Sequence, residues 1–147
     1  MNTVKDILDH KGKNVWSVAP KDTLLTALKM MEAHRVGSLL VIDQGVIKGI
    51  ITERDFCWQI ADKSSCPLDQ PVSLWMTVDV IAVPEKTSIN ECMQLMSREH
   101  IRHLPVVEEG VLAGIISIGD VVKAVISGQQ STILGLENYI LSQNYAL

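Results

Sequence analysis

The segment GIITERD at residues 49–55 returns as GIISIGD at residues 114–120, an offset of 65 positions. In both copies a Gly-Ile-Ile run is followed by a hydroxyl residue and, three positions later, by an aspartate. The same offset holds without a gap over much of the chain. It matches Val15 with Val80, Val18 with Val83, Leu28 with Met93, Leu39 with Leu104, and Gly45 with Gly110. We therefore interpret the sequence as a tandem duplication.

Each copy has the pattern of a β-α-β-β-α unit, which makes the expected fold class α/β (α+β). A short apolar strand comes first, and apolar residues near a 3.6-residue period then predict a helix. An x-Gly pair between two β-branched runs is typical of a hairpin, and a second helix follows it. The expected elements are strands at 15–18 and 80–83, helices at 22–36 and 87–101, hairpins about Gln44-Gly45 and Glu109-Gly110, and closing helices at 53–62 and 118–127.

The repeat also sets the expected domain organisation. The first unit covers residues 1–65 with an N-terminal helical lead-in, the second covers 66–128, and 129–147 form a C-terminal helical tail weakened by Gly135. One unit alone has too little core for comfortable stability, so we expect the two units to pack pseudo-symmetrically against each other.

Composition narrows the function classes. The chain has 147 residues, 47% of them hydrophobic, and a formal net charge of −4, which is normal for a globular protein. The sequence has no cluster of basic residues of the kind that binds duplex nucleic acid. It also has no apolar run that approaches the ~20 residues needed to span a bilayer. Cys57, Cys66 and Cys92 form no metal or disulfide spacing, so we expect reduced thiols, Cys92 in the core, and a cytoplasmic location. His100 and His103 lack a third ligand, and no metal is expected.

The hydroxyl-x-x-aspartate pattern has two interpretations. Thr52 with Asp55, and Ser117 with Asp120, have the spacing of a capping box, which many helices carry without binding anything. The same arrangement suits a nucleotide, because a helix N-terminus attracts phosphate and the N-cap hydroxyl adds a donor. An aspartate one turn later can accept hydrogen bonds from both hydroxyls of a ribose. The sequence leaves both interpretations open.

Basic residues near the two motifs support a phosphate partner in part. Arg54 lies at a helix start, where its charge opposes the helix dipole, and Arg102-His103 precedes the strand at 104–107. An exposed arginine without a ligand is the alternative for each. Apolar strands at Val15-Trp16 and Val80-Ile81 offer a slot for a base; Trp16 is also compatible with an ordinary core position.

The two β-α-β-β-α units, their Gly-h-h-Thr/Ser-x-x-Asp endings and the IRHLPVVE segment together resemble a tandem pair of cystathionine-β-synthase (CBS) domains, a Bateman module. The resemblance covers residues 4 to 127. The GIITERD and GIISIGDVVK segments are similar to those of family members that consist of two CBS domains without a further domain. It implies a regulatory module that binds adenine nucleotides in clefts between its two units. It also implies a homodimer that signals to an effector protein.

The resemblance assigns roles residue by residue. The ribose-binding aspartates match Asp55 and Asp120, the phosphate-side hydroxyls match Thr52 and Ser117, and the basic position matches Arg102 and His103. Gly37 and Ser38 replace that basic pair in the first unit, so the two sites are not expected to be equivalent. The full set of candidate cofactor-binding residues is Val15, Trp16, Ser38, Thr52, Arg54, Asp55, Val80, Ile81, Arg102, His103, Pro105, Ser117, Gly119 and Asp120.

The favoured function is therefore a non-catalytic sensor that binds AMP, with NAD(H), ADP or ATP as further ligands. One alternative is a structural adaptor whose clefts stay empty. The other is a nucleotide-processing enzyme, for which Glu53 is the candidate base beside the phosphate. The sequence shows no nucleophile set and no phosphate-binding glycine loop that favours the enzyme.

Overall fold

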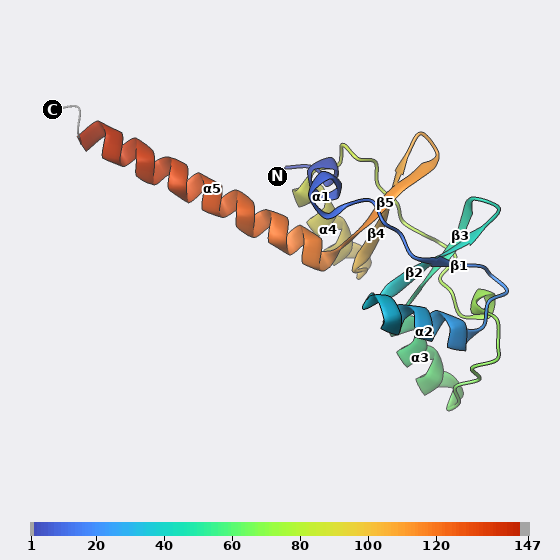
Figure 1. Ribbon diagram of the computed structural model, residues 1–147. Coiled ribbons are helices and arrows are strands. Elements are labelled where there is room, and N and C mark those ends of the chain that lie inside the picture. The colour runs from blue at the N-terminus through green and yellow to red at the C-terminus, as the bar shows by residue number, and fades with distance from the viewer. Residues whose placement is uncertain (1, 145–147) are drawn as a thin grey trace. The chain divides into compact units, whose positions relative to one another are not determined.

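Each half of the protein contains a β-hairpin that is followed by a helix (Figure 1). The structure, a computed structural model, describes residues 2–144. The chain divides into two units, which we describe separately. The first-repeat unit spans Asn14–Ile81, and the second-repeat unit combines the N-terminal segment up to Lys13 with residues from Ala82 onward.

The first-repeat unit contains a three-stranded sheet in the order β1-β2-β3. β1 pairs parallel to β2, and β2 pairs antiparallel to β3. The turn residues Gln44 and Gly45 have φ values of 48° and 77°, as the predicted hairpin requires. The elements are β1 (Ser17–Val18), α2 (Leu24–His34), β2 (Ser38–Asp43), β3 (Val46–Thr52), α3 (Glu53–Lys63) and the 3₁₀ turn η1 (Val72–Leu74).

The core of this unit joins the sheet to its helices and to the segment that precedes the second repeat. Leu24, Ala27 and Met31 of α2 pack with buried residues of β2 and β3. Trp75 is fully buried in the same core, and its indole N–H donates to Gln70 Oε1 over 2.9 Å. The segment around η1 therefore belongs structurally to the first repeat.

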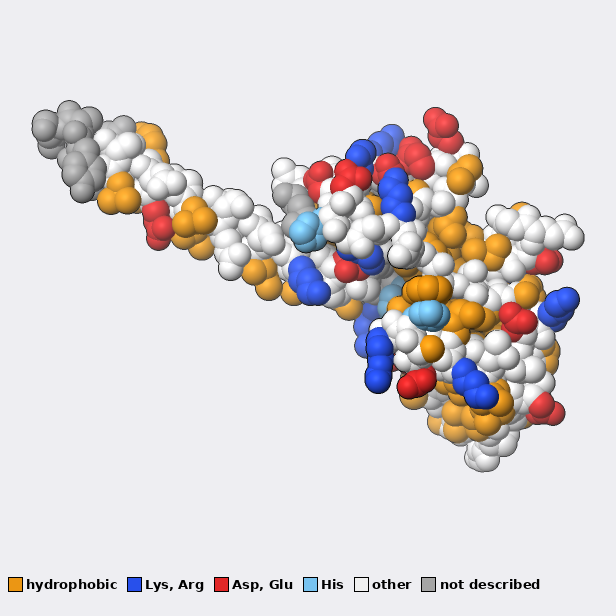
Figure 2. Space-filling view, viewed as in Figure 1, with side chains coloured by type: hydrophobic (Ala, Val, Ile, Leu, Met, Phe, Trp, Pro, Cys, Tyr) orange, Lys and Arg blue, Asp and Glu red, His pale blue; other side chains and the backbone are white. Residues whose placement is uncertain are grey.

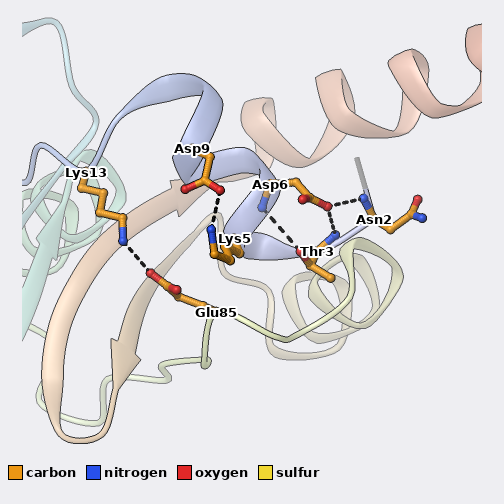
Figure 3. A network of polar contacts seen from close by, with 7 residues as sticks. All are labelled: Asn2, Thr3, Lys5, Asp6, Asp9, Lys13 and Glu85. Atoms are coloured by element: carbon orange, nitrogen blue, oxygen red, sulfur yellow. Dashed lines mark hydrogen bonds and ion pairs between the residues drawn. The ribbon is translucent and has the colours of Figure 1, made fainter.

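The second-repeat unit contains a two-stranded antiparallel sheet, β4-β5, with its register shift at the equivalent place in the hairpin. Its turn residues Glu109 and Gly110 have φ values of 48° and 79°. The capping box of Thr3 and Asp6 opens α1, and Lys13 pairs with Glu85 just after it (Figure 3). The elements are α1 (Val4–Lys11), α4 (Ile89–Glu99), β4 (His103–Glu108), β5 (Val111–Ser117) and α5 (Ile118–Asn144).

The helix α1 packs on the second repeat, although it precedes the first repeat in the chain. The Val4 N–H donates to the Thr87 carbonyl over 2.9 Å, and Leu8 is buried against Gly114 of β5. Each repeat is thus completed by the segment that precedes the other one. The boundaries at 65/66 and 128/129 describe the sequence repeat and stay a prediction.

The first strand of each repeat is shorter than predicted. Only Ser17–Val18 forms a strand in place of 15–18, and 80–83 contributes a single bridge from Val83 to Val106. Pro105 explains the second case. It occupies the place of Leu40, whose N–H donates to the Trp16 carbonyl over 3.2 Å, and a proline has no N–H to donate.

The C-terminal helix is present, but it differs from the prediction in one respect. We expected one helix to end near residue 127 and a second to begin in the tail. The structure has one continuous helix from Ile118 to Asn144 that passes through Gly128 and Gly135. Glycine costs a helix interior about 1 kcal/mol relative to alanine, which an otherwise uninterrupted helix tolerates. The rest of the predicted tail, 145–147, lies outside the described residues.

Candidate nucleotide site

The two hydroxyl-x-x-aspartate motifs form the same local geometry at the starts of α3 and α5. The Thr52 N–H donates to Asp55 Oδ2 over 2.8 Å, and the Asp55 N–H donates back to Thr52 Oγ1 over 3.3 Å. The corresponding distances for Ser117 and Asp120 are 2.7 and 3.3 Å. Both motifs are therefore capping boxes, as one interpretation of the sequence predicts.

Capping does not use the whole capacity of either aspartate. An ionised carboxylate has two oxygens and about four acceptor sites. In each box it is Oδ2 that accepts from the N-cap amide and the N-cap hydroxyl. A capping role and a ribose-binding role are therefore chemically compatible in the same side chain.

A third partner distinguishes the two aspartates. The Thr77 hydroxyl donates to Asp55 Oδ1 over 3.2 Å, from the segment that follows η1. We call the N-terminal start of α3 or of α5, with its capping box, an opening. At the α5 opening the Lys11 ammonium lies 2.7 Å from Asp120 Oδ2 and donates to the Ile115 carbonyl over 2.9 Å. The third partner of the aspartate is thus a neutral alcohol at the α3 opening and a cation at the α5 opening.

The surroundings of Asp120 favour its charged form. Burial opposes ionisation, but the Lys11 ammonium and the hydrogen bonds from the Ser117 amide and hydroxyl act against it. Together they hold the pKa of Asp120 below its ordinary value. Asp120 is therefore a carboxylate near neutral pH, which is the state that accepts hydrogen bonds from sugar hydroxyls.

The sequence interpretation did not include Lys11 or Thr77. Each lies in a segment that precedes one repeat and packs on the other, so a gapless offset does not place either beside its aspartate. The glycines Gly49 and Gly114 carry the only hint of this packing. An added Cβ would lie 2.8 Å from the Thr77 carbonyl oxygen at Gly49 and 2.8 Å from Leu8 Cδ2 at Gly114. Because they lack a Cβ, Gly49 leaves room for the segment around Thr77, and Gly114 leaves room for Leu8 of α1.

The predicted basic pair lies next to the second opening. His103 begins β4 in register with Ser117, and the Arg102 carbonyl accepts from the Ile118 N–H over 2.9 Å. Ser38 and Thr52 have the same register relation in the first-repeat unit, where Ser38 is buried. The structure therefore brings the basic pair to one hydroxyl and an uncharged pair to the other.

The second helical position also differs between the openings. Arg54 lies over the Trp58 ring at 5.3 Å from its centroid, whereas Gly119 has only Ser117 Oγ near its missing Cβ, at 3.6 Å. Gly119 thus leaves the start of α5 open on that side. Pro105 is buried in β4.

The strand residues proposed for a base slot have mixed environments. Val15, Val80 and Ile81 are half-buried. Trp16 is 41% exposed and stacks on His34 with ring centroids 3.4 Å apart. The alternative of a core position for Trp16 is therefore wrong.

The structure also places the cysteines and the candidate metal ligands among residues 2–144. Cys92 is buried, as expected, and burial raises the pKa of its thiol to about 11. Within residues 2–144 no three His, Cys, Asp or Glu side chains gather closely enough to hold a metal ion. The same part of the chain has no helix that is both long and apolar enough to span a membrane.

Comparison with known proteins gives consistent results. The CBS domain family matches the chain twice, at residues 4–62 and 72–127. The CBS domain-containing protein CBSX3, mitochondrial, of Arabidopsis thaliana is 35% identical over 94% of this chain and 71% of its own length. The CBS domain-containing protein YhcV of Bacillus subtilis is 33% identical over 82% and 83%.

Solved structures agree with the sequence relatives. The CBS-domain containing protein ATU1752 of Agrobacterium tumefaciens is 43% identical with a TM-score of 0.81, over 84% of this chain and 92% of its own. The CBS domain pair of protein MJ0100, in complex with 5′-methylthioadenosine and S-adenosyl-L-methionine, is 26% identical with a TM-score of 0.73, over 86% and 97%. This chain thus belongs to the CBS domain family, and its duplicated units are a tandem CBS domain pair, or Bateman module.

Proposed function

We propose that this protein is a non-catalytic regulatory module that binds adenine nucleotides, AMP in preference, at the starts of α3 and α5. The observation that carries the proposal is the position of the Asp120 carboxyl group, which accepts from the Ser117 hydroxyl over 2.9 Å and lies 2.7 Å from the Lys11 ammonium. A carboxylate, an alcohol and an ammonium around one helix N-terminus match the ribose hydroxyls and phosphate of a nucleotide.

The Lys11–Asp120 pair suggests how the ligand enters. The two ribose hydroxyls replace the ammonium as donors to Asp120, and the ammonium turns to the phosphate. Lys11 is partly exposed, so this movement is not blocked by packing. The exchange leaves neither charge without a partner, which keeps the cost of opening the ion pair small.

The adenosine part of the proposal is supported by a relative. The CBS domain pair of MJ0100 is described in complex with two adenosine-containing ligands, and it is 26% identical to this chain. The preference for AMP comes from the small number of cations at the Asp120 opening. A single phosphate carries a charge of about −1.5 to −2 at neutral pH, less than the di- and triphosphate chains of ADP and ATP, so it needs fewer cations in addition to Lys11.

Regulation follows if the ligand binds one arrangement of the protein better than another. Such a ligand shifts the population toward that arrangement by its difference in affinity, and a partner protein or a second copy responds to the shift.

Calorimetry and thermal unfolding with adenosine, AMP, ADP, ATP and NAD test the proposal. A ligand at about 100 times its dissociation constant stabilises the folded state by about 2.7 kcal/mol. We expect the largest shift with AMP and a smaller one with adenosine. If no member of the panel shifts the unfolding transition, the protein is a structural adaptor and the nucleotide proposal is wrong.

A further inference from the structure

The C-terminal helix α5 carries a row of exposed apolar side chains that its own unit leaves uncovered. Each is between 46% and 57% exposed. Figure 2 shows hydrophobic side chains recurring along the projecting helix. We call this row the α5 seam; it consists of Val122, Ile126, Ile133, Leu136 and Ile140, with Gln129 in the gap.

The α5 seam has the spacing of a coiled coil. Its members follow one another by alternating steps of four and three residues, so they stay on one face when two helices wrap round each other. Ile126, Ile133 and Ile140 then occupy position a of the heptad, with Leu136 at position d. Among parallel coiled coils, isoleucine at a with leucine at d favours two strands over three or four.

The charge of the helix points to a second copy as the partner. From Gly128 to Asn144 the only charged side chain is Glu137. A helix that lies on a lipid surface normally has a basic polar face, and this segment has no lysine or arginine. A charged protein partner would need complementary charges that are also absent here. Self-pairing needs none, because each apolar layer meets its own copy.

The heptad positions favour the parallel orientation over the antiparallel one. In a parallel pair Glu137, at position e, lies beside Thr132 at position g of the other copy, so no like charges meet. Gln129 meets its own amide, to which it can hydrogen-bond. In an antiparallel pair a positions face d positions, and an isoleucine would be buried against Gln129.

The available surface suits a weak dimer. An aliphatic side chain offers on the order of 100 Å² of apolar surface, and about half is exposed at the seam. The five apolar members from two copies therefore bury on the order of 500 Å². An open groove of about 600 Å³ between α4 and α5 shares Gln129 and Ile133 with the seam, so the contact can continue onto the unit. The total stays below the ~1,200 Å² of small specific interfaces, so we expect the pair to be weak and to depend on protein concentration.

We propose that α5 is a self-association helix, which pairs with α5 of a second copy through the seam as a parallel two-stranded coiled coil. This contact is independent of the nucleotide site, since no seam residue belongs to the candidate ligand set.

Sedimentation velocity of the full chain over a range of concentrations tests the contact. Ile133→Glu with Ile140→Glu removes two seam layers, and Leu134→Glu with Leu141→Glu is the matched control. The control leucines are as exposed, at 59% and 54%, but lie about 100° round the helix. We expect the seam pair to weaken association at least tenfold and the control to change it less than threefold. Equal effects, or an undisturbed dimer in the seam variant, overturn the proposal.

Cysteine crosslinking keeps the test valid if other surfaces of the protein also associate or if the glutamate variants unfold. With the exposed Cys57 and Cys66 changed to serine, Leu136→Cys places a thiol at position d, opposite its copy in a parallel pair. Leu134→Cys, off the seam, is the control. We expect disulfide formation at least tenfold faster for Leu136→Cys. Equal rates, or no crosslink at any concentration, overturn the proposal.

Discussion

The openings of α3 and α5 share a capping box, yet they differ in the group that closes them. Thr77 donates a neutral hydroxyl to Asp55, whereas Lys11 places an ammonium on Asp120. The duplication kept the hydrogen bonds that every such helix start needs and let the charge diverge. Because capping is local, it is repeated faithfully, whereas the third partner depends on which segment packs alongside. The two openings should therefore distinguish ligands by charge.

The packing of the segments beside Gly49 and Gly114 gives the largest expected difference, which is a difference in the free energy of unfolding. Gly49→Ala would set a Cβ 2.7 Å from Met76 Sδ and 2.8 Å from the Thr77 carbonyl oxygen, which is backbone. Gly114→Ala would meet only the flexible end of Leu8, at 2.8 Å. We expect losses of about 2–3 kcal/mol for Gly49→Ala and about 1 kcal/mol for Gly114→Ala, measured by urea unfolding. Equal losses would show that the two segments are held equally firmly.

The next effect concerns ligand binding. Asp120→Ala should weaken AMP binding at the α5 opening by an order of magnitude or more, because the ribose hydroxyls lose a charged acceptor. Asp120→Asn is the control that keeps an oxygen for capping and removes the charge. Titrations in an Asp55→Ala background leave one opening to observe. Unchanged affinity of Asp120→Ala for AMP in calorimetry would mean that this carboxylate only caps its helix.

A smaller change tests the charge difference itself. Lys11→Met should weaken AMP binding about threefold to tenfold more than adenosine binding, since only AMP has a phosphate for the ammonium. Thr77→Val at the other opening should affect the two ligands alike. If Lys11→Met weakens both ligands equally, then Lys11 holds the site together without contacting phosphate, and the openings do not differ in the way proposed.

Sequence alone predicted what is local and repeated. The offset of 65 residues located both hairpins, whose turn residues all have positive φ, and both capping boxes. It did not predict that α1 packs on the second repeat or that Lys11 reaches Asp120, because a repeat shows which residues are equivalent and not which copy a preceding segment contacts. Pro105 shortened a strand for a reason visible in the sequence, the missing N–H, but only once its pairing with Val83 is known.

The smallest expected effect is the pH dependence of the Lys11–Asp120 pair. In the unfolded chain Asp120 takes up its proton near the ordinary value of 3.8, and in the folded protein its pKa is lower. The unfolded state therefore binds more protons in this range. The pair stabilises the protein above that value and loses its contribution as pH falls toward the folded pKa. Both groups are partly exposed, so the contribution is a few tenths of a kcal/mol.

Urea unfolding at pH 6 and pH 3 checks this, with Lys11→Met against Thr77→Val. Lys11→Met should lose less stability between the two pH values than the unmodified protein, because its Asp120 lacks the nearby cation that lowers the pKa. Thr77→Val removes no charge and should keep the original slope. If Thr77→Val flattens the slope as much as Lys11→Met does, the electrostatic difference between the openings is not what distinguishes them, and their divergence would have to come from shape.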